Sequence, residues 1–122
     1  MNDWTAGDLE QVGAAEELQI SSSRTDGSLR PYVTIWVVRV GDDLYVRSYR
    51  GQNGAWFRSA LRRPEGRIRA GGAERDVAFE PADDADQDAI DQAYRSKYAR
   101  FSYVGSMVSP DVRLTSLRLV PR

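Results

Sequence analysis

The longest apolar run in the chain covers residues 32–40, YVTIWVVRV, and it is rich in β-branched side chains. A nearly continuous run of this kind predicts a strand that is buried on both faces, near the centre of a sheet. A turn follows at residues 41–43, and residues 44–50 then alternate, which divides their side chains between two faces: Leu44, Val46 and Ser48 on one, Tyr45, Arg47 and Tyr49 on the other. The two runs together predict a β-hairpin.

Weaker patterns predict the remaining elements. Thr5 can cap a first helix that runs to about Glu17, and Asn53 can cap a short helix that carries Trp56. A third helix is predicted over residues 82–100 by an apolar face at helical spacing, which consists of Ile90, Ala93, Tyr94, Tyr98 and Phe101. Short runs bounded by turn residues predict further strands over residues 18–22, 67–70, 74–80 and 113–120. The runs 67–70 and 74–80 flank Gly71-Gly72 and predict a second hairpin.

The order of these elements indicates the fold class. Helix, three strands, short helix, two strands, helix and strand follow one another, without the regular alternation of strand and helix that is typical of parallel sheets. About six short strands therefore predict an α+β fold in which an antiparallel barrel or sheet carries flanking helices. With 122 residues, the chain has the length of one domain, residues 1–122.

Targeting signals are not evident in the sequence. It holds no run of ~18 apolar residues, which a helix would need to span a membrane. The stretch from Met1 to Glu17 is acidic and polar, unlike a signal or transit peptide. We therefore expect a cytoplasmic protein with no membrane partner.

The composition narrows the chemistry, because the sequence contains neither cysteine nor histidine. Disulfides, thiol nucleophiles, zinc–thiolate sites, His-ligated metals and imidazole acid–base catalysis are thereby excluded. The carboxylates show no spacing that indicates a metal site. Any activity must use carboxylates, tyrosines, arginines, hydroxyls, backbone amides or a bound cofactor.

Charge is segregated along the chain, although the net charge is only −1. Residues 47–69 hold seven arginines and one acid, whereas residues 74–91 hold eight acids and one arginine. The acids crowd the first turns of the predicted helix 82–100 and bases its last turns, an order that complements the helix dipole. Two explanations of the many arginines are open: a compositional bias of the source genome, or an anion site, because guanidinium matches phosphate and carboxylate. A nucleic-acid-binding stripe is disfavoured by the sequence pI of 5.4 and the single lysine, Lys97.

The strand end Arg47-Ser48-Tyr49-Arg50-Gly51 is the first candidate site. It enters a glycine-containing loop before a helix N-terminus, where two arginines, a hydroxyl and free backbone amides can hold a phosphate or carboxylate. The spacing is not that of a P-loop. The structural alternative is a solvent-exposed strand edge.

Two aromatic segments are further candidates. Trp56 can stack on a flat ring while Arg58 or Ser59 bonds its polar edge; the alternative is an aromatic side chain that packs in the core. Tyr94 and Tyr98 form one helical ridge beside Lys97, which packing against the barrel would explain equally well.

Several segments together resemble a small bacterial family, domain of unknown function 2255: VTIWVVRVG at residues 33–41, LYVRSYRG at 44–51, GAWF at 54–57, AYRSKY at 93–98 and TSLRLVP at 115–121. That family is in turn similar to the split β-barrel group, which includes pyridoxamine-phosphate-oxidase-like proteins and deazaflavin-dependent reductases. The similarity lies in the predicted hairpin and in the following Trp-aromatic helix that ends in LRRP at residues 61–64. The resemblance implies an antiparallel split β-barrel with flanking helices.

In the split-barrel group, these elements bind the phosphate and ring of a flavin, often at a homodimer interface. The resemblance implies that the cofactor is FMN or a deazaflavin, that a second copy closes the site, and that the protein is an oxidoreductase. Its implied contacts are Arg47, Ser48, Arg50 and Gly51 for the phosphate, Trp56, Arg58 and Ser59 for the pocket lining, and Thr34 and Trp36 for the ring. The chain departs from the deazaflavin pattern because its loop lacks a lysine and Ser59-Ala60-Leu61 replaces an Asn-Leu step. The alternative is a cofactor-free protein that holds a small anionic ligand in the same pocket.

Overall fold

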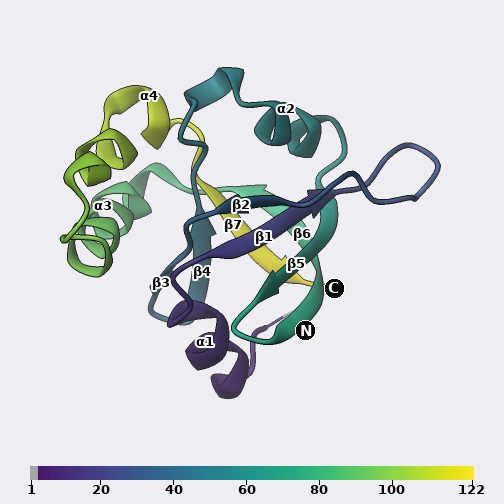
Figure 1. Ribbon diagram of the computed structural model, residues 1–122, viewed down its shortest axis with the longest axis horizontal. Helices are drawn as coiled ribbons and strands as arrows, with labels where there is room; N and C mark the ends of the chain where they lie inside the picture. The colour runs from purple at the N-terminus through teal and green to yellow at the C-terminus, as the bar shows by residue number, and fades with distance from the viewer. Residues whose placement is uncertain (1–2) are drawn as a thin grey trace.

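One antiparallel sheet of seven strands forms the centre of the computed structural model, which describes residues 3–122 (Figure 1). The strands lie in the order β2-β1-β5-β6-β7-β4-β3. Their bounds are β1 Leu18–Ser22, β2 Val33–Ile35, β3 Val38–Val40, β4 Asp43–Val46, β5 Glu65–Ala70, β6 Ala73–Pro81 and β7 Leu117–Pro121. We expected no targeting signal in residues 1–17, and the first two of these residues lie outside the described part of the chain.

The apolar run at residues 32–40 is not one central strand, and this prediction was wrong. It forms β2 and β3, which occupy opposite edges of the sheet, with Trp36 and Val37 between them. Because two residues join the two edges, the sheet must curl until these edges lie close together, which gives a split barrel (Figure 1). The run is continuously apolar for another reason: Val37 packs into one hydrophobic core and Val38 into a second.

The predicted hairpin of β3 and β4 is confirmed, and its alternation separates these two cores. Val38 pairs with Tyr45 across the hairpin. Leu44 and Val46 are fully buried inside the barrel, whereas Tyr45 faces an outer core beneath helix α3, Gln87–Lys97. Each such buried side chain stabilises the fold by roughly 1.5–3 kcal/mol. The barrel therefore has a filled interior and a second apolar layer that holds α3 on its outside.

Two helices lie at opposite ends of the barrel (Figure 1). Helix α1, Ala6–Gly13, begins as predicted, because the Thr5 hydroxyl accepts a hydrogen bond from the Asp8 N–H at 3.1 Å, but it ends before Glu17. Helix α2, Ala55–Arg62, is capped by Gly54 and not by Asn53 as predicted. The reason is the 3-10 turn η1, Gly51–Asn53, which occupies the residues before the cap.

The carboxyl-terminal third differs most from the predicted elements. Helix α3 starts only after a second 3-10 turn, η2 (Asp84–Asp86), although Ile90, Tyr94 and Tyr98 are buried as predicted. The segment after it contains two elements that the sequence did not indicate, η3 (Ser102–Val108) and α4 (Pro110–Arg113). As a result β7 begins at Leu117, and Leu114 is 67% exposed instead of lying in a strand.

The fold class is therefore the predicted one: α+β, an antiparallel split barrel with flanking helices, with seven strands where about six were expected. The second predicted hairpin is also confirmed, since β5 and β6 pair around Gly71 and Gly72, which both have positive φ. No helix within residues 3–122 combines the length and apolar character needed to cross a membrane. Over the same residues, carboxylates do not gather into a group that could hold a metal ion.

Candidate functional site

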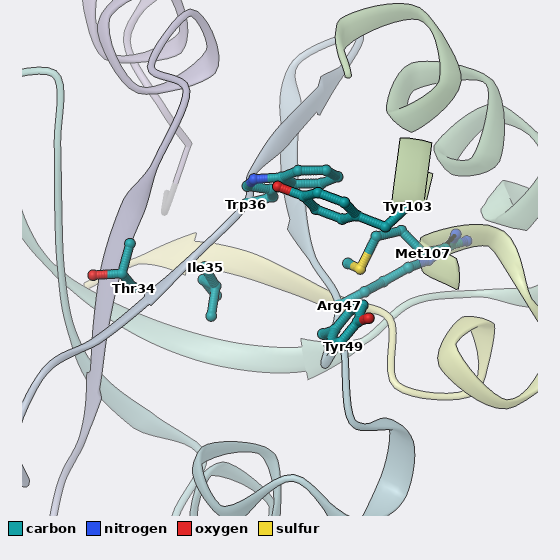
Figure 2. Close-up of a pocket in the computed structure, with 7 residues that line it drawn as sticks. All are labelled: Thr34, Ile35, Trp36, Arg47, Tyr49, Tyr103 and Met107. Atoms are coloured by element: carbon teal, nitrogen blue, oxygen red, sulfur yellow. Dashed lines mark hydrogen bonds between the residues drawn. The ribbon is translucent and has the colours of Figure 1, made fainter. Parts of the chain in front are cut away.

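A two-part cleft lies along the split of the barrel, between β2 and the chain that leaves β4. One part has a volume of about 430 Å³ and the other about 370 Å³. They adjoin, because Thr34, Ile35 and Tyr49 line both. We name the first part the aromatic lobe, which is completed by Trp36, Arg47, Tyr103 and Met107 (Figure 2). We name the second part the polar lobe, which is completed by Val33, Ser48, Arg50, Asn53, Gly54, Ala55 and Trp56.

Stacked rings build one wall of the aromatic lobe. The Trp36 indole lies parallel to the Tyr98 ring, with 3.8 Å between the ring centroids. The Tyr103 ring stacks beside Trp36 with 5.3 Å between the centroids (Figure 2). Tyr103 is half exposed, whereas Met107 is buried beside it. Flat aromatic faces of this kind favour a ligand that has a planar ring.

Lys97 and Tyr98 hold the backbone next to Trp36 on the side away from the cleft. The Lys97 ammonium donates hydrogen bonds of 2.6–2.8 Å to the carbonyl groups of Gly13, Ala15 and Val37. The Tyr98 hydroxyl accepts a hydrogen bond from the Val37 N–H at 3.2 Å. Burial lowers the pKa of Lys97 to about 8 and raises the pKa of Tyr98 to about 12. These contacts hold the two-residue link between β2 and β3, and thereby the indole that lines the lobe.

The polar lobe contains unused hydrogen-bonding groups. The Ser48 side chain is buried, yet its hydroxyl has no partner within the described residues. Gly54 lies against it so closely that a Cβ there would overlap the hydroxyl oxygen. Helix α2 starts at this point, and its first N–H groups, at residues 55–57, have no acceptor inside the helix and no side-chain cap. Arg50 is exposed beside them. These donors together suit an anion.

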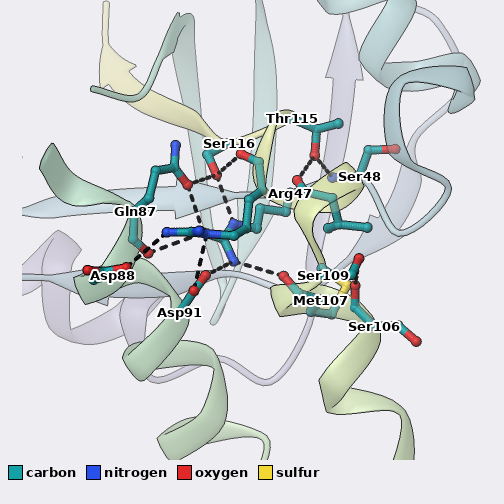
Figure 3. A network of polar contacts seen from close by, with 12 residues as sticks. Arg47, Ser48, Gln87, Asp88, Asp91, Ser106, Met107, Ser109, Thr115 and Ser116 are labelled. Atoms are coloured by element: carbon teal, nitrogen blue, oxygen red, sulfur yellow. Dashed lines mark hydrogen bonds and ion pairs between the residues drawn. The ribbon is translucent and has the colours of Figure 1, made fainter. Parts of the chain in front are cut away.

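Arg47 is engaged inside the protein, which corrects the expectation that its guanidinium grips a phosphate. Its side chain is fully buried and donates to groups on α3, on η3 and on Ser116, the residue before β7 (Figure 3). The contacts are Nε to Ser116 Oγ at 2.8 Å, Nη1 to Asp91 Oδ1 at 2.6 Å and to the Met107 carbonyl at 2.8 Å, and Nη2 to the Gln87 side chain at 2.9 Å and its carbonyl at 3.4 Å. All five N–H groups of a guanidinium are thus used.

The Arg47 network is a structural device behind the cleft. Asp91 also contacts Arg113 at 3.2 Å, so one carboxylate balances two guanidinium groups. Tyr94 packs 5.3 Å beneath the Arg47 guanidinium, and burial raises the pKa of that phenol. Breaking a buried pair of this kind commonly costs about 3–5 kcal/mol, because the remaining charge stays buried.

Six of the nine predicted site residues line the cleft, and three do not. Thr34, Trp36, Arg47, Ser48, Arg50 and Trp56 line it. Arg58 points into a different hollow on the far side of α2, Ser59 is buried, and Gly51 forms the positive-φ start of η1 next to Asp111. The physical reason is the helical turn, which directs residues 58 and 59 away from the face that carries Trp56.

Sequence reasoning missed four residues that line the aromatic lobe, Ile35, Tyr49, Tyr103 and Met107, and four that line only the polar lobe, Val33, Asn53, Gly54 and Ala55. Tyr49 lies within the predicted motif, and its exposed position at a strand end was the available signal. Tyr103 and Met107 come from η3, a segment with no periodic pattern. Nothing in the sequence indicated that it folds over the aromatic lobe.

The arginines of residues 47–69 do not form a continuous basic stripe. Arg67 and Arg69 of β5 pair with carboxylates on the neighbouring strand β6. Arg63 pairs with Glu65 two residues further on, and Arg47 pairs with Asp91 on α3. Exposed pairs of this type contribute little to stability, but they neutralise the charge. The segregation of charge along the sequence is thus largely cancelled in the folded chain.

The curled antiparallel sheet with a cleft along its split places this protein in the class of split β-barrels. The chain belongs to the family DUF2255, described as uncharacterised proteins conserved in bacteria, whose model matches residues 8–119. This confirms the family that the sequence motifs indicated. No curated protein matches the chain.

Solved structures share the fold at low sequence identity. An F420-H2-dependent reductase is 14% identical, with a TM-score of 0.64 over 86% of this chain and 93% of its own. The haem storage protein HutZ from Vibrio cholerae is 15% identical, with a TM-score of 0.61 over 88% of this chain and 82% of its own. An FAD-binding protein from Mesorhizobium loti is 16% identical, with a TM-score of 0.52 over 97% and 88%. At these identities, the similarity establishes the fold.

Proposed function

We propose that this protein binds a flavin-type cofactor, FMN or a deazaflavin, in the two-part cleft and serves as an oxidoreductase. The observation that carries the proposal is the adjacency of the two lobes. A wall of stacked rings lies next to a pocket that holds a buried, unpartnered serine hydroxyl and a free helix N-terminus. A flat ring joined to a phosphate has both of the matching chemical parts.

The residues present fit such a group. Trp36, Tyr49 and Tyr103 would hold the ring and exclude water from one of its faces. Ser48, Arg50 and the first N–H groups of α2 would hold the phosphate. When bound, a flavin or deazaflavin supplies hydride transfer, a reaction that the side chains of this chain do not provide.

The structural neighbours support a flat ligand in this fold. Their descriptions name F420-H2, FAD and haem as the molecules that they use, bind or store. We favour FMN or a deazaflavin because Ser48, Arg50 and the start of α2 gather at one place in the polar lobe, where they would hold one phosphate. We also propose that the protein works as a homodimer, because the cleft is open to solvent along the exposed faces of Tyr49 and Tyr103.

A cofactor-free function is the second candidate, and the polar lobe favours it. Ser48, Arg50 and the α2 N-terminus would hold a small anion without any ring in the aromatic lobe. Such a protein would bind inorganic phosphate or a small carboxylate and show no response to flavins.

Ligand titration separates the two candidates. We would record the absorbance spectrum of the purified protein and then titrate it with FMN, a deazaflavin and inorganic phosphate, following tryptophan fluorescence. The proposal expects micromolar binding of FMN or the deazaflavin that is weakened by a ring-lobe variant, Tyr103→Ala, and by Arg50→Ala. Phosphate binding that Arg50→Ala weakens and Tyr103→Ala leaves intact, with no flavin binding, would establish the second candidate.

A matched control is available for the charge change. Arg95 is an exposed arginine on α3, outside the cleft. Arg95→Ala removes the same charge as Arg50→Ala and should leave all affinities unchanged. Equal losses in both variants would mean that net charge, and not the polar lobe, determines binding.

A further inference from the structure

Helix α2 begins without a side-chain cap, although its backbone would allow one. Its N-cap residue is Gly54, which offers no side chain to the free N–H groups of residues 55–57. Helix α1 differs, because its N-cap Thr5 accepts a hydrogen bond from the Asp8 N–H. The backbone is extended at both caps, with φ −73° and ψ 160° at Thr5 and φ −62° and ψ 132° at Gly54. Position 54 therefore suits serine, asparagine or aspartate as well as it suits glycine.

The space beside Ser48 explains why position 54 is a glycine. A Cβ at this position would overlap the Ser48 hydroxyl oxygen, whereas the Gly51 carbonyl oxygen and the Ser48 Cβ would be 3.4 and 3.5 Å away, at ordinary contact distance. Ser48 is 1% exposed, and its hydroxyl has no hydrogen-bond partner within residues 3–122. Gly54 thus leaves room for a buried hydroxyl that the described part of the fold does not itself use.

The groups that meet at this point of the polar lobe are hydrogen-bond donors. Ser48 and Arg50 donate from the strand end and the N–H groups of residues 55–57 from α2, and none of the described residues that line the lobe is a carboxylate. Tyr49 also lines the lobe, while Asp111 of α4 lies against Gly51 and lines neither lobe. The lining has no ionised acceptor for the proton of a hydrogen phosphate, so it favours a fully ionised oxyanion.

We propose that Gly54 is a specificity-determining residue, which leaves the start of α2 and the Ser48 hydroxyl free for a fully ionised oxyanion, the dianion of a phosphate monoester. A capping side chain at position 54 would accept from the same N–H groups and displace the Ser48 hydroxyl, and the lobe would lose these donors. Sulfate carries the same charge and should bind as well. This inference rests on the proposed function, in which the lobe holds the phosphate of the cofactor, and it names the residue that keeps the lobe available.

The pH dependence of anion binding tests the preferred charge state. We would follow the amide NMR signals of residues 55–57 during titration with glycerol phosphate and with sulfate, at about pH 5 and about pH 7.5. A phosphate monoester has a second pKa of about 6, so its affinity should be about tenfold lower at pH 5. Sulfate should bind equally at both pH values, since it stays a dianion and arginine stays protonated. Equal affinity for glycerol phosphate at both pH values would overturn the preference for the dianion.

Variants in a Ser48→Ala background separate capping from space. Gly54→Ala should be tolerated there, because its Cβ meets no hydroxyl, and should keep the anion affinity of Ser48→Ala within about twofold. Gly54→Asn should bind both anions at least ~10-fold more weakly than Gly54→Ala, because its side-chain oxygen accepts from the α2 N–H groups, yet its urea midpoint should be equal or higher. A glycine with a merely structural role would not link a loss of binding to a gain in stability. Retained binding in the Ser48→Ala, Gly54→Asn variant would overturn the proposal.

Single glycine variants complete the experiment. Gly54→Ala alone should bind both anions ~10-fold more weakly, because the new Cβ displaces the Ser48 hydroxyl. Gly7→Ala on α1, at the opposite end of the barrel, places its Cβ 3.9 Å from Thr5 Oγ1 and should leave both affinities unchanged (Figure 1). Full affinity in Gly54→Ala, or a wild type that binds neither anion at about 10 mM, would overturn the role of Gly54.

The same variants distinguish this inference from the proposed cofactor. Anion binding that follows the expected pattern in a protein that does not bind FMN would overturn the flavin proposal and leave the role of Gly54 intact. FMN binding that survives the Ser48→Ala, Gly54→Asn double change would overturn the role of Gly54 alone.

Discussion

Arg47 and Arg50 belong to one predicted anion-binding segment, but the folded chain uses them in opposite ways. Arg47 is fully buried, and every N–H of its guanidinium donates to a protein group. Arg50 is exposed in the polar lobe and makes no ion pair within the described residues. Arg47 still follows the strand face of Tyr45 into the outer core, whereas Arg50 lies beyond the strand, before η1. An arginine-rich segment can therefore combine a structural residue with a candidate ligand contact.

The largest expected effect comes from removing Arg47. Arg47→Met should lower the free energy of unfolding by about 3–5 kcal/mol, because the buried Asp91 keeps only its longer contact with Arg113 and the Gln87 side chain loses its donor. Urea unfolding followed by circular dichroism measures this change. The double variant Arg47→Met, Asp91→Leu should recover part of the loss, since it leaves no unpaired charge. A loss below ~1 kcal/mol for the single variant would contradict a structural role.

Arg50→Ala should give the opposite result. Its unfolding free energy should stay within ~0.5 kcal/mol of the wild type, as is usual for an exposed residue without partners. The affinity for FMN or for inorganic phosphate should fall ~10-fold, because a charge-assisted donor is lost. Isothermal titration calorimetry measures the affinity, with Arg95→Ala as the control. Unchanged affinity would show that Arg50 does not contact the ligand, and the proposed difference in role between Arg50 and Arg47 would be wrong.

The Ser48 hydroxyl should contribute to anion affinity but not to the stability of the fold, which gives a smaller effect than either arginine. Ser48→Ala removes a buried hydroxyl that has no partner in the described chain, so the unfolding free energy should be unchanged or rise by up to ~1 kcal/mol. The backbone should stay in place, since the Ser48 N–H still donates to Thr115 Oγ1 at 2.8 Å. Anion affinity should fall several-fold. A variant less stable than the wild type by more than ~1 kcal/mol would show that the hydroxyl is satisfied within the fold.

The contrast between the two arginines also shows how far the sequence could be used. Local patterns predicted the hairpin of β3 and β4, the hairpin of β5 and β6 and the buried face of α3, because alternation and helical spacing record local burial. They could not show that the run at residues 32–40 crosses from one sheet edge to the other, since a strand buried on two faces and a link between two cores are equally apolar. The predicted role of Arg47 was wrong for a similar reason, since its acceptors Asp91, Met107 and Ser116 lie far away in the sequence.

The candidate site was predictable only where it coincides with a local motif. Ser48, Arg50 and Trp56 lie next to the strand end and the start of α2, and the motif placed them in one pocket. Tyr103 and Met107 reach the aromatic lobe through η3, whose position depends on the outer core and on the Arg47 contact with the Met107 carbonyl. Arg47, which was predicted to contact a ligand, thus helps to position the residues of the aromatic lobe.

The smallest expected effect concerns Lys97, a cation whose burial is intermediate between that of Arg47 and that of Arg50. It is half-buried and donates to three carbonyl groups, and no carboxylate within residues 3–122 pairs with it. Burial lowers its pKa from 10.5 to about 8, so between these pH values the folded chain holds a neutral amine while the unfolded chain still binds the proton. Stability should therefore rise as the pH increases from about 8 towards 10.

Above pH 10 the trend should reverse. Burial raises the pKa of Tyr45 and of Tyr98 from 10 to about 12, so the unfolded chain loses these protons first. Urea midpoints measured in half-unit steps from pH 7.5 to 11 would resolve both slopes. Lys97→Met should abolish the rise and keep the fall, since it removes only the amine. A wild-type midpoint that declines steadily from pH 8 would mean that the three carbonyl groups hold the ammonium more strongly than burial disfavours it, which would make Lys97 a cation as firmly held as Arg47.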